Sequence, residues 1–109
     1  MKLWIDDCRP APKGYIHAHS VERAKELIQI AEILDSMVSH LNNSNWQIEV
    51  IDIDHDAGEY ANNGGDYIKL LDWLEETGRN YPIRIHSMNP VGAQNMRAII
   101  QKNGWREVR

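Results

Sequence analysis

Short apolar runs alternate along this chain with longer stretches in which apolar residues recur every three or four positions. The longer stretches predict three helices, and the short runs predict strands. Because strands that alternate with helices favour a parallel sheet with helices on its faces, we expect a three-layer α/β fold. The five predicted strands are Lys2–Ile5, Tyr15–Ala18, Ile48–Ile53, Ile83–Ile85 and Trp105–Val108.

The first predicted helix begins after Ser20, a good N-cap residue, and runs to Asn42. A second apolar stripe on this helix, formed by Ile30, Ile33 and Met37, is a candidate face for forming a homo-oligomer. The positions predicted to face the core are Ala24, Leu27, Ile28, Ala31, Leu34, Val38 and Leu41.

The second predicted helix follows a loop rich in glycine and asparagine, Ala57–Gly65. Asp66 is positioned to cap this helix, which ends near Gly78. Its apolar positions are Tyr67, Leu70, Leu71 and Leu74.

The third predicted helix has Asn89 as its N-cap and Pro90 at its first position, and it ends at Asn103-Gly104. Its core-facing residues are Ala93, Met96, Ile99 and Ile100. No helix is expected directly after the first strand, because Pro10 and Pro12 oppose one there. The first crossover helix of the sheet is therefore predicted to be missing or reduced.

Composition limits the class of protein. With 109 residues, we expect a single domain over positions 1–109. The net charge of −4 argues against a face that binds duplex nucleic acid, but it leaves room for a small nucleotide in a local pocket. The single cysteine excludes an intrachain disulfide framework. With no membrane-spanning apolar run and no signal-peptide pattern, we expect a cytoplasmic protein without membrane contact.

Three polar runs each follow a predicted strand. In an open parallel sheet, ligands bind outside the carboxyl ends of the strands, so these runs should meet at one edge. Carboxylates, imidazoles, a guanidinium and a hydroxyl would then share one pocket. The runs are Asp6-Asp7-Cys8-Arg9-Pro10, Asp54-His55-Asp56 and His86-Ser87-Met88-Asn89-Pro90.

The four carboxylates of these runs predict a cation site. Neighbouring carboxylates repel one another unless a cation lies between them, and oxygen ligands suit Mg²⁺ or Mn²⁺. The alternative for the first pair is a solvated strand end, and the alternative for Asp56 is a helix cap. The predicted metal ligands are Asp6, Asp7, Asp54 and Asp56.

Two histidines are candidates for proton transfer. His55 and His86 could act as a general base and a general acid, the two transfers that opening a cyclic phosphodiester requires. The alternative for His86 is a hydrogen bond to a neighbouring loop. His17, His19 and His40 are expected to be structural or solvated.

The remaining polar residues suggest phosphate binding. Arg9 suits bidentate contact with a phosphate or, alternatively, an ion pair with Asp7. Ser87 and the helix start capped by Asn89 could hold an anion. Asp52 lies inside a strand, where an unpaired carboxylate is costly, so it is either paired or part of the site.

Cys8 lies within the first polar run. Nearby carboxylates should raise the pKa of its thiol, which argues against a nucleophilic role.

The motifs resemble a known family. An Asp-Asp pair after the first strand, an aspartate ending the central strand and a hydroxyl after the next strand resemble a response-regulator receiver domain. More specifically, the chain resembles the cyclic-phosphate processing receiver domains over its whole length. This resemblance implies a flavodoxin-like, receiver-like fold and an association with cyclic-phosphate nucleotides or RNA ends. It rests on Trp4-Ile5-Asp6-Asp7-x-Arg9-Pro10, Asp54-His55-Asp56-x-Gly58 and His86-Ser87-Met88-Asn89-Pro90-x-Gly92.

One departure from ordinary receivers matters. They carry a lysine at the end of the last strand, and residues 105–109 contain none. This argues against a phosphoacceptor receiver that uses Asp54.

The sequence therefore predicts a metal-assisted phosphoesterase, a hydrolase acting on a cyclic or terminal phosphate of a nucleotide or RNA end. The alternative is a non-catalytic module that senses or sequesters such a nucleotide. In the enzyme hypothesis, Mg²⁺ or Mn²⁺ is the cofactor and a phosphorylated small molecule, nucleotide or RNA end is the partner. The predicted catalytic residues are His55, His86 and Asp54, and the predicted substrate-binding residues are Arg9, Ser87 and Asn89.

Overall fold

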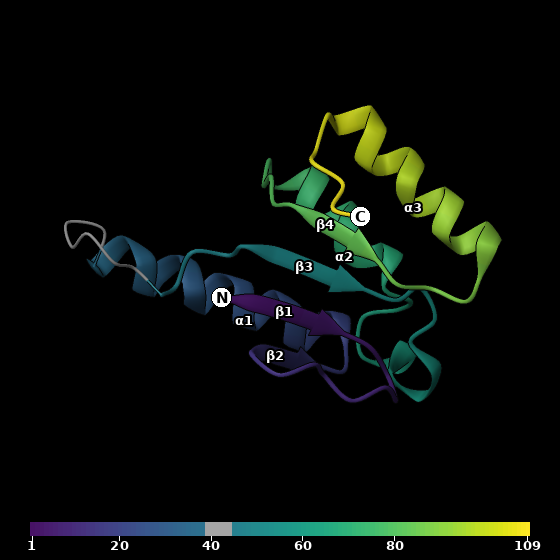
Figure 1. Ribbon diagram of the computed structural model, residues 1–109, viewed down its shortest axis with the longest axis horizontal. Helices are drawn as coiled ribbons and strands as arrows, with labels where there is room; N and C mark the ends of the chain where they lie inside the picture. Colours follow the sequence, from purple (N-terminus) through teal and green to yellow (C-terminus); the bar gives the residue numbers. More distant parts are fainter. Residues whose placement is uncertain (39–44) are drawn as a thin grey trace.

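The computed structural model describes residues 1–38 and 45–109 of the chain. Four strands form one parallel sheet in the order β2-β1-β3-β4 (Figure 1). Three helices and a short 3-10 helix, η1, flank the sheet, so the predicted receiver-like α/β fold is confirmed. The elements are β1 Lys2–Ile5, β2 Tyr15–Ala18, α1 Val21–Val38, β3 Val50–Ile53, η1 Gly58–Asn62, α2 Ile68–Glu76, β4 Ile83–Ile85 and α3 Pro90–Asn103.

One face of the sheet forms the hydrophobic core. Side chains alternate between the two faces of a strand, and the parallel register places Leu3 beside Ile51 and Ile51 beside Ile83. All three of these side chains are fully buried. The helices contribute to the same cluster through Ala24 and Ile28 of α1, Leu70, Leu71 and Leu74 of α2, and Met96 and Ile100 of α3.

The other face of the sheet is polar and aromatic. Trp4, Asp52 and Arg84 are neighbours there on β1, β3 and β4. As predicted, β1 is joined to β2 by a loop without a helix. This loop packs over the sheet, and the indole Nε1 of Trp4 donates a hydrogen bond of 3.0 Å to the carbonyl of Arg9. The missing crossover helix is thus replaced by a loop that carries the first polar run.

Two predicted helix caps are confirmed. The Ser20 hydroxyl accepts a hydrogen bond from the Arg23 amide at 3.0 Å, at the start of α1. The Asn89 side chain accepts one from the Gly92 amide at 2.9 Å, with Pro90 at the first position of α3.

The predicted cap of α2 was wrong. The helix begins at Ile68 after Tyr67, without a side-chain cap. The Asp66 carboxylate instead accepts a hydrogen bond from the amide of Ala57 at 3.0 Å. Ala57 is fully buried, and a buried amide needs a partner, so Asp66 stabilises the loop rather than the helix.

The C-terminal segment pairs less than predicted. Only Glu107 forms a β-bridge, with Ile83, and no strand spans Trp105–Val108. β4 itself has only three residues, and Trp105 is buried in the core, which leaves little length for pairing. Gly104 ends α3 with a left-handed φ of 66°, as predicted.

Helix α1 carries both predicted stripes. Ala24, Ile28 and Ala31 are buried, whereas Leu27, Leu34 and Val38 are half-buried. The second stripe is exposed, with Ile30, Ile33 and Met37 at 47%, 59% and 65%. The predicted end at Asn42, together with Leu41 and His40, lies outside the described residues. Within residues 1–38 and 45–109, no helix has the length and apolar character needed to cross a membrane.

Candidate functional site

The three polar runs meet at the carboxyl edge of the sheet. The Asp54 amide donates to the carbonyl of Ile5 at 2.9 Å, and the His86 amide donates to the carbonyl of Ile53 at 2.9 Å. The ends of β1, β3 and β4 are therefore held level, and the residues that follow them lie side by side. This is the juxtaposition that the sequence predicted.

Asp6 is fully buried at this edge. Its Oδ1 accepts hydrogen bonds from the amides of Cys8 at 3.0 Å and Arg9 at 2.9 Å, and its Oδ2 lies 2.8 Å from Nε2 of His86. Burial raises the pKa of Asp6, but the bonds from Arg9, Cys8 and His86 together outweigh burial, so the pKa lies below its usual value. Asp6 is therefore an ionised, buried carboxylate near neutral pH.

His86 lies between two buried carboxylates. Its Nδ1 is 2.6 Å from Oδ1 of Asp52, and its Nε2 contacts Asp6. Its ring stacks on Trp4 with 3.8 Å between centroids and 3° between planes, and the side chain is only 7% exposed. Both ring nitrogens are engaged, so His86 has no nitrogen left to face a substrate.

Asp52 was expected to be either paired or part of the site, and its contacts show that it is paired. It is 1% exposed, and its second oxygen accepts from Nη1 of Arg84 at 3.0 Å. Sequence reasoning missed the resulting chain of contacts from Arg84 to Asp6. The signal was available: Arg84 lies on β4 and His86 comes two residues later, directly after the strand, a spacing that places both side chains on one face.

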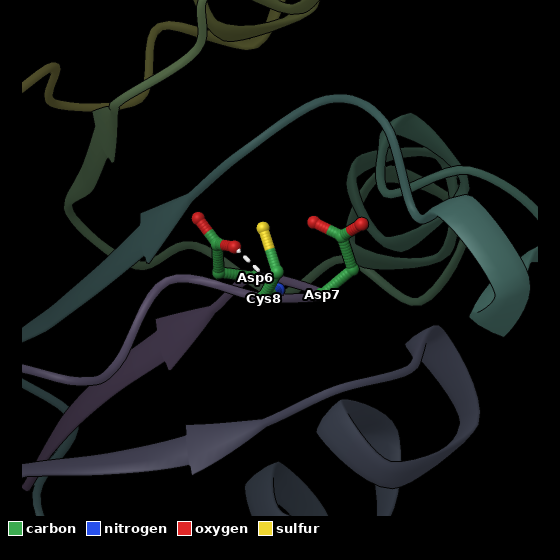
Figure 2. Close-up of side chains that lie close together, drawn as sticks. All are labelled: Asp6, Asp7 and Cys8. Atoms are coloured by element: carbon green, nitrogen blue, oxygen red, sulfur yellow. Dashed lines mark hydrogen bonds between the residues drawn. The ribbon is translucent and has the colours of Figure 1, made fainter.

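Asp6, Asp7 and Cys8 form an acidic group with one ligand atom each, all within 4.8 Å of one another. Figure 2 shows their side chains rising from the loop after β1 on the same side. Gly58 allows Asp7 to lie close to η1, because a Cβ at this position would come within 2.6 Å of the Asp7 carboxylate. Asp7 and Cys8 line a cavity of about 230 Å³ together with Glu59 and Tyr60.

Asp54 and Asp56 lie outside that group of ligand atoms. Asp54 is half-buried, and its Oδ1 accepts from the amide of His55 at 2.7 Å. Asp56 is 61% exposed and bonds to the ring of His55. The four predicted metal ligands are thus divided between a close acidic group and two neighbouring carboxylates.

The Cys8 thiol is not activated. The negative charge of Asp7 is the largest cause raising the pKa of Cys8, followed by desolvation and by Asp6. The thiol therefore stays protonated near neutral pH, which confirms the predicted effect of the carboxylates on this residue.

His55 and Asp56 form a pair beside the start of α3. Nδ1 of His55 lies 2.8 Å from Oδ1 of Asp56, and this hydrogen bond is the main cause lowering the pKa of Asp56. If Nδ1 carries the proton that Asp56 accepts, Nε2 keeps its lone pair and can act as a base. Gly92 packs against the ring, since a Cβ at this position would lie 2.4 Å from Cγ of His55.

The predicted phosphate-binding residues are bonded within the first and third polar runs and to Asp56. The Ser87 hydroxyl accepts from the amide of Asn89 at 3.1 Å. The side-chain amide of Asn89 donates to Asp56 at 3.3 Å while its oxygen caps α3. Arg9 contributes its amide to Asp6 and its carbonyl to Trp4, so its backbone is part of the site.

His17 lies on β2, and His19 is the first residue after that strand. Their rings stack with 3.9 Å between centroids, and Nε2 of His17 contacts the carbonyl oxygen of Asp6 at 2.8 Å. Burial is the main cause lowering the pKa of His19. The structural role expected of His17 is thus visible in its contact with the loop.

The geometry defines a receiver-like domain with carboxylates at the ends of its central strands. The chain belongs to the cyclic-phosphate processing receiver domain family, whose model matches residues 1–102. The predicted family is confirmed, and with it a place among domains associated with cyclic-phosphate processing. Comparison with curated proteins and with solved structures gave no match.

Residues 105–109 carry no lysine, and the basic side chain bonded to Asp6 is His86, from the end of β4.

Proposed function

We propose that this protein is a metal-assisted phosphoesterase acting on a cyclic or terminal phosphate of a nucleotide or RNA end. The observation that carries the proposal is the meeting, at one edge, of the acidic group of Asp6, Asp7 and Cys8 with the His55–Asp56 pair. The family membership supports a cyclic phosphate as the substrate class.

The donor set fits a hard divalent cation. Oδ1 of Asp6 already accepts two amides and Oδ2 accepts one contact from His86, so one lone pair of Oδ2 is left for a cation. Asp7 adds a second carboxylate, which lines a cavity with Cys8, Glu59 and Tyr60. Asp6, Asp7 and Asp54 would hold Mg²⁺ or Mn²⁺, which supplies Lewis-acid polarisation of a phosphoryl oxygen when bound.

His55 would carry the proton in this proposal. Asp56 holds Nδ1, and Nε2 takes a proton from the attacking water as the new P–O bond forms. The same nitrogen then returns that proton to the leaving oxygen as the ester P–O bond breaks. His86 is not assigned a proton transfer, because both of its nitrogens are bonded to carboxylates. Asp56 accordingly orients His55 and is not assigned as a metal ligand.

The phosphate itself would be held by residues of the first and third polar runs. Arg9 carries the positive charge suited to bidentate contact, and Ser87 supplies a hydroxyl. The start of α3 beside His55 adds the positive end of the helix dipole.

A second candidate is a non-catalytic module that senses or sequesters a cyclic nucleotide. One specific observation favours it: the engagement of both His86 nitrogens removes one member of the acid–base pair that sequence reasoning assigned. A phosphoacceptor role for Asp54 is a weaker candidate, because the final-strand lysine is missing.

A paired experiment separates the enzyme from the binding module. Product release from nucleotide 2′,3′-cyclic phosphates is followed by chromatography, and affinity is measured by calorimetry, both with Mn²⁺. General acid–base groups typically supply about 10²–10⁴-fold, so His55→Gln should lower turnover by about 10²-fold or more and leave affinity nearly unchanged. His40→Gln, which changes a histidine outside the three polar runs, is the matched control and should retain turnover.

The outcomes are distinct. Tight binding without product by the native protein would replace the enzyme with the sequestering module. Absence of both binding and turnover across cyclic and terminal phosphates would overturn both candidates.

A further inference from the structure

The polar face of the sheet holds a continuous chain of contacts that the proposed reaction does not use directly. It runs from Arg84 to Asp52, from Asp52 to His86, and from His86 to Asp6, with contacts of 3.0, 2.6 and 2.8 Å. It begins at a side chain that is 44% exposed and ends at a fully buried carboxylate. We call Arg84, Asp52, His86 and Asp6 the polar chain.

Stability alone is a poor explanation for the polar chain. Removing two carboxylates and an imidazole from water is costly, and replacing a buried ion pair with apolar residues of similar size is often neutral or stabilising. The other face of the same strands shows that apolar packing is available to this sheet, through Leu3, Ile51 and Ile83. A role at the Asp6 end of the polar chain, where Asp6 joins the acidic group, accounts better for these buried contacts.

The geometry around His86 is suited to holding another side chain in place. Its ring has little rotational freedom, because it is stacked on Trp4 and bonded on both sides. Trp4 is itself fixed by its hydrogen bond to the carbonyl of Arg9. Nε2 of His86 therefore reaches the Oδ2 of Asp6 from a constrained direction.

From these contacts we infer that Asp52 is a positioning residue, which acts through His86 to hold the Asp6 carboxylate in the orientation needed for a divalent cation. The inference rests on the proposed function, because the cation site is part of that function. Carboxylate and imidazole groups that orient metal ligands commonly change metal affinity by about 10–100-fold when mutated. Asp52 would then act without touching the cation or the substrate.

The experiment compares three variants of the full chain. Asp52→Ala removes the carboxylate that contacts Nδ1 of His86, and Asp52→Asn keeps an oxygen at that position without the charge. Val50→Ala is the matched control, because Val50 lies on the same strand and on the same face, two residues earlier, and is 8% exposed. Folding of each variant is checked by circular dichroism.

Two readouts are measured on each protein. The first is Mn²⁺ affinity by calorimetry, which should fall by about 10–100-fold in Asp52→Ala, less in Asp52→Asn and not at all in Val50→Ala. The second does not need metal: the amide resonances of Cys8 and Arg9, which donate to Asp6, should move in the Asp52 variants and stay in place in Val50→Ala. If Asp52→Ala does not fold, the same comparison is made with Asp52→Asn.

The readouts distinguish this inference from the proposed function. If the native protein binds no Mn²⁺, the proposed cation site fails, and the Cys8 and Arg9 resonances still test whether Asp52 positions Asp6. Unmoved resonances in a folded Asp52 variant would overturn the inference whatever the metal does. Shifted resonances with unchanged Mn²⁺ affinity would also overturn it, because Asp6 would then bind the cation without help from Asp52.

Discussion

The two faces of the sheet are built from the same strands by different physical means. One face packs Leu3, Ile51 and Ile83 against three helices, through contacts that depend on area and have little directionality. The other face holds Asp52 and His86 through directional bonds. The apolar face therefore specifies the fold, whereas the polar face specifies where individual atoms of the site lie.

The difference predicts unequal tolerance to substitution. His86→Leu leaves the carboxylates of Asp6 and Asp52 buried without the ring between them, which should lower the free energy of unfolding by about 3–5 kcal/mol. Ile51→Val, a loss of one methylene on the apolar face of β3, should cost only about 0.5–1.5 kcal/mol. Urea denaturation measures both, and equal losses would contradict the proposed difference between the faces.

A smaller effect is expected where α3 meets the site. In most helices, glycine to alanine gains about 1 kcal/mol from helix propensity. At Gly92 the added Cβ would lie 2.4 Å from the His55 ring, so overpacking that costs about 1–3 kcal/mol should outweigh this gain. Gly92→Ala should therefore lower stability and shift the His55 ring resonances. Gln94→Ala, on the exposed surface of the same helix, is the control, and a stabilised Gly92→Ala protein would show that α3 can move away from His55.

The smallest expected effect is on acid stability. The folded-state pKa of Asp6 lies below its usual value, so the folded protein binds fewer protons than the unfolded chain as the pH falls through the ordinary carboxyl range. Stability contributed by Asp6 is therefore present above about pH 4 and is lost below it. Glu32, whose pKa is also lowered beside Arg79, contributes in the same direction from α1, far along the chain from the site.

Urea denaturation of Asp6→Asn and Glu32→Gln between about pH 3 and 7 separates the two contributions. Each variant should show a shallower loss of stability in acid than the native protein. A native protein whose stability does not change over that interval would contradict both assignments.

Much of the fold could be predicted because it depends on local chemistry. Short apolar runs located the four strands of the sheet, and helical spacing located the three helices. Ser20, Asn89 and Gly104 act where capping and helix termination predict. Asp66 could not be assigned in this way, since its partner, the amide of Ala57, is a buried group brought to it by the loop. The predicted C-terminal strand failed because pairing also requires length in the neighbouring strand.

The candidate site, like the fold, could be predicted only in part. The order of residues along the chain was enough to identify the polar runs that follow the strands, and the parallel order of β1, β3 and β4 was enough to bring them to one edge. The partner of each side chain at this edge depends on how the segments pack in three dimensions. His55 and His86 are equivalent as residue types, yet one faces Asp56 beside a helix start and the other lies between two buried carboxylates. Hydrogen bonding and burial depend on distances of a few ångströms between segments far apart in the chain, which periodicity and spacing do not encode.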